Sequence, residues 1–318
     1  MSASESANEI EKRLLRDVQQ LPSLCTGGAL AIGNFDGVHL GHAQLIERLL
    51  KAAGRCGGPA VVLTFDPSPL SLLKPEVVPP RLTTIERRAD LLIRLGVDWV
   101  VAYPTQRSTL QWSPQEFFES IVVQRLRARA VVEGENFFFG KDRQGNVETL
   151  RELCDTNGLQ LDVVRMAVSG EQVISSSRVR ELLLRGEVAE AKRCMTAPYA
   201  ISGQVVRGAQ RGRDLGFPTA NLAEITTLVP GPGVYAATVE LAGRVYRAAI
   251  HIGPNPTYGE NQVKVETHII GFQGDLYGAI ISVEFHQRIR DVKRFSSVEE
   301  LRSQLQRDIA QAATEVAP

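Results

Sequence analysis

Long apolar runs and paired cysteines are both missing from this sequence. No stretch approaches the roughly 20 apolar residues of a membrane-spanning helix, and the polar first residues hold no apolar signal-peptide core. The 4 cysteines lie far apart and form neither a Cys-x-x-Cys pair nor a zinc spacing. We therefore expect a cytoplasmic protein with reduced thiols and no membrane association.

An excess of charge is also missing, because 36 Lys and Arg residues balance 36 Asp and Glu residues. A net charge of 0 argues against binding to nucleic acid through bulk electrostatics, so we expect no nucleic-acid partner. What the chain does have is an ordinary globular composition, 43% hydrophobic and 23% charged, and its 318 residues favour two domains. We expect a monomer or a weak homo-oligomer.

The first half of the chain alternates between β-rich apolar runs and helical periods. The apolar runs cover residues 30–32, 60–65, 99–102, 130–133 and 161–164, and the helical periods cover 41–54, 84–95, 114–127 and 147–157. Strands that alternate with helices of this length predict a parallel sheet with helical crossovers, hence an α/β domain. Ligands of such a sheet bind beyond the carboxyl ends of its strands.

The second half consists of short alternating runs separated by Gly- and Pro-rich turns, which predict a small antiparallel barrel. The runs cover residues 200–206, 234–241, 245–252, 264–271 and 280–285. Between the halves, residues 178–195 are predicted to be helical, and Ser296-Ser297 precedes an amphipathic C-terminal helix. The predicted domains are an N-terminal extension at 1–25, the α/β domain at 26–185, a linker at 186–198 and the barrel at 199–318.

The segment AIGNFDGVHLGH, which ends at His42, carries the strongest chemical signal. Gly33, Gly37 and Gly41 follow an apolar run, and His39 and His42 stand where a helical period begins. Glycines let the backbone approach a phosphate, and the free amides and dipole of a helix N-terminus attract it. The two imidazoles add donors for charge that develops on a phosphoryl group. The alternative is a helix start with two exposed histidines.

A second candidate phosphate segment is ISSSRVR, which ends at Arg180. It places three hydroxyls and two guanidiniums at the start of a helical period. One or two hydroxyls could serve as a helix cap, and a cap with a solvated arginine is the alternative interpretation. Arg178 is suited to hold a phosphate through two parallel hydrogen bonds. Together with the histidine segment, it predicts a clamp for a triphosphate.

The second half has its own candidate site, in the segment from Gly203 to Asn221. Glycines interrupt three arginines there, which favours a loop that wraps phosphates with its backbone amides, although a solvated turn is the alternative. The Thr219 hydroxyl and the Asn221 amide are oxygen ligands of the kind Mg²⁺ prefers. Further on, strand alternation puts Glu266 and His268 on one face. A carboxylate facing the loop could take the proton of an attacking hydroxyl.

Several of these segments resemble known motifs. GNFDGVHLGH and ISSSR are similar to the HxGH and ISSTR motifs of nucleotidylyltransferases. With TFDPSP (64–69), RLT (81–83) and GENFFFG (134–140), they resemble the N-terminal module of the bifunctional riboflavin kinase/FAD synthetase family. GRDLGFPTAN, GVYA, NPTY, ETH and DLYG resemble its riboflavin kinase module. The resemblance spans residues 26 to 312. It implies a Rossmann-like nucleotidylyltransferase domain, then a six-stranded antiparallel β-barrel with a C-terminal helix.

In this family, ATP phosphorylates riboflavin to FMN, and a second ATP adenylylates FMN to FAD with release of pyrophosphate. The resemblance implies that His39 and His42 contact the ATP phosphates, while Ser176, Ser177 and Arg178 hold the phosphates that become pyrophosphate. It also implies a nucleotide pocket lined by Gly33, Asn34, Phe35, Asp36 and Gly41, and a flavin site near Phe65, Asn136 and Phe137.

For the kinase module, the resemblance implies that Thr219 and Asn221 hold Mg²⁺ and that Glu266 is the catalytic base for the riboflavin 5′-hydroxyl. It places Gly208, Arg211, Gly212 and Pro218 on the ATP, and Arg290 beside the flavin. His251 and Gly271 depart from the family pattern, and we expect neither to take part in the chemistry.

A further departure is Ser68, which stands where the family has a histidine in TF[DE]PHP. The loss of that ring donor leaves open a working kinase joined to a weak or inactive adenylyltransferase. The residues also allow a flavin-binding regulatory protein that senses FMN without turnover, or a monofunctional enzyme of the cytidylyltransferase type. The intact magnesium and base residues argue against the regulatory protein, and the monofunctional enzyme leaves the barrel without a purpose.

Overall fold

The computed structural model describes residues 10–17, 21–165, 168–169, 172–208, 211–254 and 263–316. The chain divides into two compact units, one made of Met1–Pro79 and Thr84–Ser175, the other of Pro80–Thr83 and Ser176–Pro318. The predicted domain boundaries remain predictions. Within the described ranges, no helix has both the length and the apolar character needed to cross a membrane.

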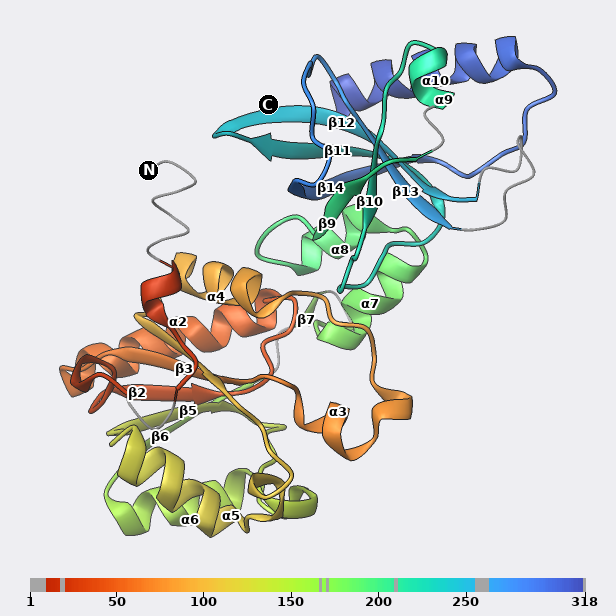
Figure 1. Cartoon of the computed structure of the whole chain (residues 1–318). Helices are drawn as coiled ribbons and strands as arrows, with labels where there is room; N and C mark the ends of the chain where they lie inside the picture. The colour runs from red at the N-terminus through yellow and green to blue at the C-terminus, as the bar shows by residue number, and fades with distance from the viewer. Residues whose placement is uncertain are drawn as a thin grey trace. The chain divides into compact units, whose positions relative to one another are not determined.

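The first unit is built on a parallel sheet, as predicted (Figure 1). The sheet has six strands, and β1 is not among the five predicted runs. Its strands are β1 (Leu14–Leu15), β2 (Ala29–Ile32), β3 (Ala60–Phe65), β4 (Trp99–Tyr103), β5 (Ala130–Gly134) and β6 (Gln160–Val164). Their order across the sheet is β1-β4-β3-β2-β5-β6, and every neighbouring pair is parallel. A separate antiparallel pair joins β7 (Val168–Ser169) to β8 (Gln172–Val173).

Helices cover both faces of this sheet, with α2 and α4 on one side and α5 and α6 on the other in Figure 1. The α-helices are α2 (Leu40–Cys56), α3 (Pro69–Leu73), α4 (Ile85–Arg94), α5 (Pro114–Phe117) and α6 (Val147–Asn157). The segment predicted as one helix at 114–127 continues α5 with a π-helix, η4 (Phe118–Arg125). Short 3₁₀ turns are η1 (Ser23–Cys25), η2 (Pro75–Val77), η3 (Thr109–Gln111) and η5 (Lys141–Arg143).

The strand order places the centre of the first unit at β2. From β2 the chain builds outward through β3 and β4, and it then crosses to β5 on the other side of β2. Such a reversal opens a crevice beyond the carboxyl ends of the two strands that flank it, and ligands of open α/β sheets bind there. The glycine–histidine segment follows β2, and the segment with Asn136 and Phe137 follows β5, so both follow the two strands that flank this reversal.

The second unit is a closed barrel with strand order β10-β13-β12-β11-β14-β9, which confirms the predicted six-stranded antiparallel architecture. The strands are β9 (Ala200–Val206), β10 (Ala220–Ala223), β11 (Gly233–Leu241), β12 (Arg244–Gly253), β13 (Lys264–Ile269) and β14 (Ile280–Arg290). Five of them match predicted runs. The sixth, β10, contains Asn221 and is not among those runs, because its four residues are too few to display an alternating pattern.

Four helices accompany the barrel in the described part of this unit: α7 (Ser176–Leu184), α8 (Val188–Cys194), α9 (Arg211–Asp214) and α10 (Val298–Glu315). The segment predicted to be helical at residues 178–195 forms two helices, because Gly186 at φ +77° separates α7 from α8. A β-carbon on Gly186 would lie 2.6 Å from the Tyr235 hydroxyl, so the break is packed against the barrel. The C-terminal helix is capped as predicted, with the Ser297 side chain accepting the Glu300 amide proton.

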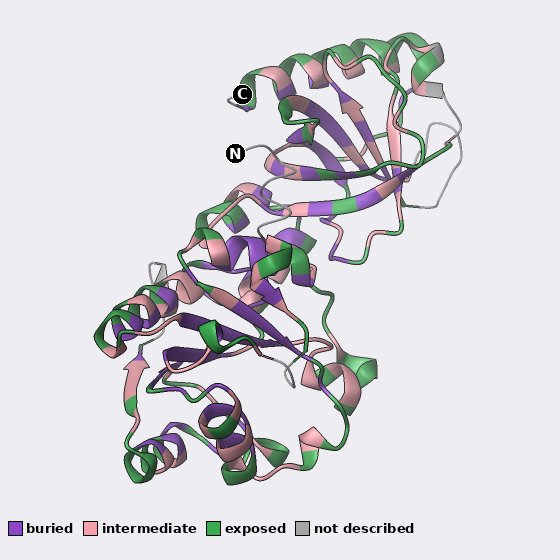
Figure 2. Ribbon diagram, turned by 60° about the vertical axis from the view of Figure 1, so that its left-hand side comes forward, coloured by how far each residue is buried: buried purple, intermediate pink, exposed green. Residues whose placement is uncertain are grey.

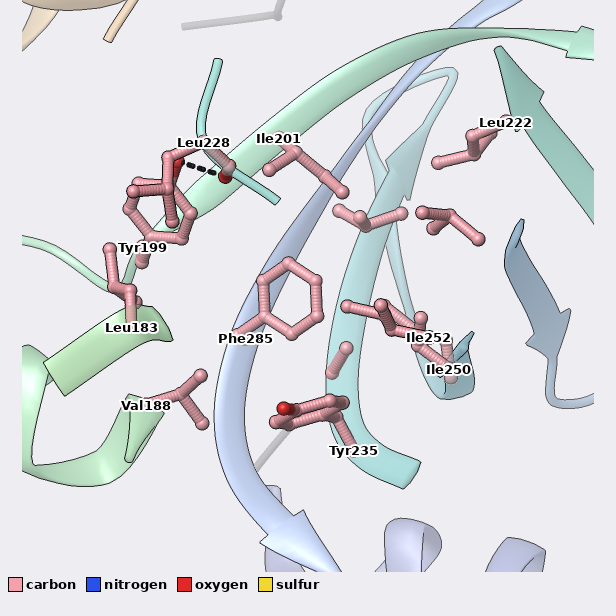
Figure 3. Packing of buried hydrophobic residues seen from close by; sticks show 14 of the residues in the cluster. Leu183, Val188, Tyr199, Ile201, Leu222, Leu228, Tyr235, Ile250, Ile252 and Phe285 are labelled. Carbon is pink, nitrogen blue, oxygen red and sulfur yellow. Dashed lines mark hydrogen bonds between the residues drawn. The ribbon is translucent and has the colours of Figure 1, made fainter. Parts of the chain in front are cut away.

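The core of the second unit joins the barrel interior to α7 and α8 (Figure 3). Tyr199, Tyr235 and Phe285 are its largest fully buried side chains, and Leu183 and Val188 pack against them from α7 and α8. The Tyr199 hydroxyl donates to the Leu228 carbonyl, so its polar end is satisfied. In Figure 2 the strands of both units are mostly buried, whereas the outward faces of the helices, α10 among them, are exposed.

Candidate functional site

The loop after β2 is held in a shape that few sequences adopt. Phe35 and Val38 have positive φ angles of +47° and +39°, which are costly for residues with a β-carbon, and Gly37 between them is at +83°. Both side chains are buried, so packing enforces the loop. A β-carbon on Gly33 would lie 3.2 Å from the Phe35 ring, so the turn is closely packed there. The predicted phosphate segment is therefore a tightly packed turn at the carboxyl end of β2.

His39 and His42 form a reciprocal cap at the N-terminus of α2. The His42 amide donates to Nδ1 of His39 at 3.4 Å, and the His39 amide donates to Nδ1 of His42 at 3.2 Å. The two rings stack with centroids 3.7 Å apart. A β-carbon on Gly41 would lie 3.1 Å from the His39 ring, so a larger residue there would press on the stack. The prediction that these residues belong to one helix start is confirmed.

Burial of the two imidazoles keeps both of them neutral. Burial lowers the pKa of His39 to about 4, against the opposing charge of Asp36. Burial, His39 and the Arg88 guanidinium lower the pKa of His42 well below its usual value. Both rings are thus neutral at pH 7, and each Nδ1 is an acceptor. The remaining proton of each ring sits on Nε2, which makes both Nε2–H groups donors for a phosphate oxygen.

A buried arginine that sequence reasoning missed supports the loop from below. Arg88 of α4 donates to the Thr64 hydroxyl at 3.0 Å and contacts Asp36 at 3.3 Å. Thr64 in turn donates to the Asn34 carbonyl at 3.0 Å, and the side chains of Arg88, Thr64 and Asp36 are all buried. The helical spacing of the sequence could have indicated that Arg88 is buried, because it lies on the same face of α4 as Ile85.

A second missed residue is Glu133, which lies at the end of β5 beneath the same loop. Its Oε1 accepts the amide proton of Ile32, the last residue of β2, at 2.6 Å. Burial raises the pKa of this carboxyl well above its usual value. Glu133 therefore joins the carboxyl ends of β2 and β5. The sequence could have indicated a special role for Glu133, because it lies in an apolar β-run and buried acids are rare in such runs.

The predicted flavin residues lie along a chain of aromatic rings. Phe65 contacts Phe117 at 6.5 Å between centroids, Phe117 contacts Phe139 at 6.2 Å, and Phe139 stacks on Phe137 at 5.3 Å. Asn136 is exposed beside this wall. Phe117 and Phe139 are buried, and Phe65 at the end of β3 and Phe137 after β5 are partly buried against the same core. A planar heteroaromatic ring could pack on the exposed parts of Phe65 and Phe137.

Ser68 directly precedes α3 as its N-cap residue, but its side chain makes no capping hydrogen bond. Its carbonyl accepts from the Ser71 amide and hydroxyl instead. The half-buried hydroxyl is thus not used to hold the helix. A substitution of Ser68 would therefore not remove a helix-capping hydrogen bond.

Ser176, Ser177 and Arg178 form the first turn of α7, and the division of the chain places them in the second unit. Arg178 pairs with Glu181 at 2.9 Å, one turn along the helix. In the first unit, Ile174 approaches α2, since its carbonyl oxygen lies 3.4 Å from where a Gly41 β-carbon would be. That these three residues complete a clamp with His39 and His42 stays a prediction.

In the barrel, the predicted catalytic residues come together through strand register. Asn221 on β10 is directly opposite Glu266 on β13, and Glu266 is directly opposite His251 on β12. Side chains of directly opposed residues share one face of a sheet. Glu266 therefore lies between Asn221 and His251. The alternation prediction is confirmed, because Val265 and Thr267 are buried while Glu266 and His268 are half-buried.

The glycine loop is folded onto these residues. A β-carbon on Gly208 would lie 2.4 Å from Nδ2 of Asn221, and one on Gly212 would lie 3.4 Å from the Thr219 hydroxyl. The Pro218 carbonyl accepts from Nδ1 of His268 at 2.8 Å, which ties the PTAN segment to β13. The structure thus brings the glycines, Thr219, Asn221 and Glu266 together. The side chain of Arg211 lies outside the described residues, as does the NPTY segment.

These oxygens fit a magnesium ion bound together with a nucleotide. Thr219 supplies a hydroxyl and Asn221 an amide oxygen, the neutral oxygen ligands that Mg²⁺ accepts when phosphates and waters complete its shell. The Gly208 backbone packs against the Asn221 amide, because a β-carbon at 208 would lie 2.8 Å from the amide oxygen. Among the described residues, no cluster of three or more His, Cys, Asp or Glu side chains could hold a metal ion.

Comparison with known proteins gives matches along the whole chain. A family model described as FAD synthetase matches residues 22–178, and one described as riboflavin kinase matches residues 195–316. The bifunctional riboflavin kinase/FMN adenylyltransferase of Pseudomonas fluorescens is 33% identical, covering 96% of this chain and 98% of its own length. The protein of the same description from Escherichia coli K12 is 34% identical, with 93% and 95% covered.

A solved structure also matches nearly the full length. It is described as a macrolide-efflux protein from Streptococcus pneumoniae, with a TM-score of 0.83, 31% identity, and 95% of this chain and 98% of that chain covered. Its similarity supports the two-part architecture, a parallel α/β unit followed by a closed barrel.

Proposed function

Because this chain belongs to the bifunctional riboflavin kinase/FMN adenylyltransferase family, we propose that it converts riboflavin to FAD in two ATP-dependent steps. The barrel unit phosphorylates riboflavin to FMN, and the α/β unit transfers AMP from a second ATP to that FMN. The main observation behind the proposal is that each candidate site contains the residues that its reaction needs. Asn221 and Glu266 are opposed in the barrel, and neutral His39 and His42 cap α2.

In the first step, Glu266 accepts the proton of the riboflavin 5′-hydroxyl. The hydroxyl oxygen forms a bond to the γ-phosphorus of ATP, and the bond from that phosphorus to the β–γ bridging oxygen breaks, so that ADP leaves with the electron pair. Thr219 and Asn221 would hold Mg²⁺, which neutralises phosphate charge when bound. Gly208 and Gly212 let the loop backbone approach the nucleotide, with Arg211 and Pro218 beside them.

In the second step, a phosphate oxygen of FMN attacks the α-phosphorus of ATP, and pyrophosphate leaves. This in-line transfer needs orientation and charge stabilisation and no covalent protein nucleophile. The Nε2–H groups of His39 and His42 donate to the phosphate chain, supported by the fixed turn at Phe35 and Asp36. Ser176, Ser177 and Arg178 hold the leaving pyrophosphate.

The flavin of the second step would pack on the aromatic wall. Phe65 and Phe137 offer ring faces to the isoalloxazine, and exposed Asn136 supplies polar contacts at its edge.

Ser68 lies shortly after Phe65, where a histidine donor would stand in most of the family. The proposal assigns no catalytic role to Ser68, because the two histidines of α2 already supply ring donors. Small molecules are the only proposed partners, and the cytoplasm is the proposed location.

The test is a time course of riboflavin with Mg-ATP, followed by chromatography of the flavins and an assay of pyrophosphate. We expect FMN to appear first and then to decline as FAD and pyrophosphate rise together. The same assay started from FMN should yield FAD without a lag. FMN that accumulates without FAD would contradict the second activity and support the alternative of a kinase with an inactive adenylyltransferase. Bound flavin without turnover would contradict both.

A further inference from the structure

One half-buried histidine of the barrel has no role in either transfer step. His251 on β12 is directly opposite Glu266 on β13, and Nδ1 of His251 lies 3.7 Å from Oε2 of Glu266. Each side chain is 22% exposed. The row of opposed residues therefore runs from Asn221 through Glu266 to His251, with the carboxylate in the middle.

The imidazole nitrogen that faces this carboxylate is not satisfied. Nδ1 of His251 is buried and has no hydrogen-bond partner among the described residues. On the other side of β12, the residue opposite His251 is the apolar Val234 of β11. A buried nitrogen without a partner is unfavourable, so a short shift that closes the 3.7 Å separation from Glu266 gains a hydrogen bond.

We propose that His251 is a positioning residue for riboflavin phosphorylation, in which its Nδ1–H donates to Oε2 of Glu266 and holds the carboxylate for proton transfer. This inference rests on the proposed role of Glu266 as the base. With Oε2 held by His251, Oε1 is the oxygen that takes the proton of the 5′-hydroxyl. The interpretation replaces our expectation that His251 lies outside the chemistry.

The physical reason is the freedom of a glutamate side chain. Three rotatable bonds separate its carboxylate from the strand, and a base works only when its oxygen is within hydrogen-bond reach of the hydroxyl. One fixed hydrogen bond to the second oxygen removes much of that freedom before the substrate binds. A strand neighbour is well suited to give it, because its position is fixed by register.

The first experiment compares variants of the full-length protein at position 251 in the kinase assay. We expect His251→Leu to lower kcat about 10- to 100-fold while KM for riboflavin changes less than about threefold, because the histidine acts on the base and not on substrate binding. His251→Asn should recover most of kcat, since its amide nitrogen can donate from nearly the same position. Circular dichroism and thermal unfolding of the same samples report whether the barrel is folded.

The matched control is His286→Gln, which changes another half-buried histidine of the barrel. His286 contacts Thr238 at 3.0 Å and Lys192 at 3.4 Å, and neither residue belongs to the proposed site. We expect its kinase kcat to stay within about twofold of the unmodified protein. Equal losses in His251→Leu and His286→Gln would mean that any histidine change weakens the barrel, and this would overturn the proposal.

A double-variant cycle with Glu266→Gln separates positioning from folding. If His251 acts through Glu266, then His251→Leu has no further effect on the residual kinase rate of Glu266→Gln. An equal fold-loss in both backgrounds would overturn the positioning role and leave the base intact. Normal kinase activity in Glu266→Gln alone would overturn the proposed base, and the role of His251 with it.

Discussion

In the first unit the proposed phosphate donors His39 and His42 come from one short loop, whereas in the second unit the proposed magnesium ligand Asn221 and the proposed base Glu266 come from neighbouring strands. His39 and His42 are placed by a turn with positive φ angles and by a buried arginine beneath it. Asn221 and Glu266 are placed by antiparallel register, with the glycine loop folded over Asn221. The positions of His39 and His42 therefore depend on the buried side chains that support their loop. The positions of Asn221 and Glu266 depend on the register between their strands.

The largest expected difference is catalytic, since each unit should lose only its own reaction. Glu266→Gln removes the proposed base, and we expect the rate of FMN formation from riboflavin to fall about 10²- to 10⁴-fold. His42→Asn keeps an acceptor for the His39 amide but removes the Nε2–H donor, and FMN adenylylation should fall about 10²- to 10³-fold.

Each of these variants is the control for the other, measured with both assays on the same sample. Glu266→Gln should adenylylate FMN at the normal rate, and His42→Asn should phosphorylate riboflavin at the normal rate. If either change lowered both activities to the same extent, the two sites would not be chemically separate, and the comparison between them would fail.

A smaller effect, on stability, should distinguish the loop-built site through its buried support. Arg88→Met leaves the Asp36 carboxylate buried without its cation, and we expect the free energy of unfolding to fall by about 3–5 kcal/mol in urea denaturation. Arg87→Met, one residue earlier on α4, removes an ion pair to Asp90 whose arginine is 25% exposed. It should cost less, about 1 kcal/mol, because Asp90 keeps its second ion pair, to Arg94 at 2.7 Å.

A compensating change tests whether the uncompensated charge is the cause. Asp36→Asn combined with Arg88→Met should be more stable than Arg88→Met alone, since no buried charge is left. A double variant no more stable than the single one would show that Arg88 supports the loop through packing and its bond to Thr64, and not through Asp36.

The comparison also explains which parts of each site the sequence could predict. The loop residues are adjacent in sequence, so glycines and histidines near a helix start are enough to indicate an anion site. Arg88 and Glu133 were missed, because they are distant in sequence and only the fold places them beneath the loop. In the barrel, alternation placed Glu266 on the correct face. Its register with Asn221 and His251 could not be derived, since β10 is too short to recognise and register is a tertiary property.

The smallest predicted effect concerns pH and the loop-built site. His39 has a pKa of about 4 in the folded protein and about 6.5 when unfolded, so its neutral form is favoured by folding. Above pH 6.5, His39 is neutral in both the folded and the unfolded protein, so it does not change the free energy of unfolding. As the pH falls from 6.5 toward 4, the unfolded chain takes up a proton that the folded chain does not, and stability is lost.

His39→Asn should remove this dependence while keeping the helix cap, because asparagine is a favoured N-cap residue. Between pH 7 and pH 5, the unmodified protein should lose about 2 kcal/mol more of its unfolding free energy than the variant. The contributions of His286, whose pKa is also lowered to about 4, and of Glu133, whose raised pKa acts in the opposite direction, are present in both proteins and cancel. His42, whose pKa is lowered chiefly by burial, contributes in both proteins as well. Urea denaturation at the two pH values measures the difference. Equal losses in the two proteins would mean that His39 is solvated, and that the stacked cap does not hold it neutral.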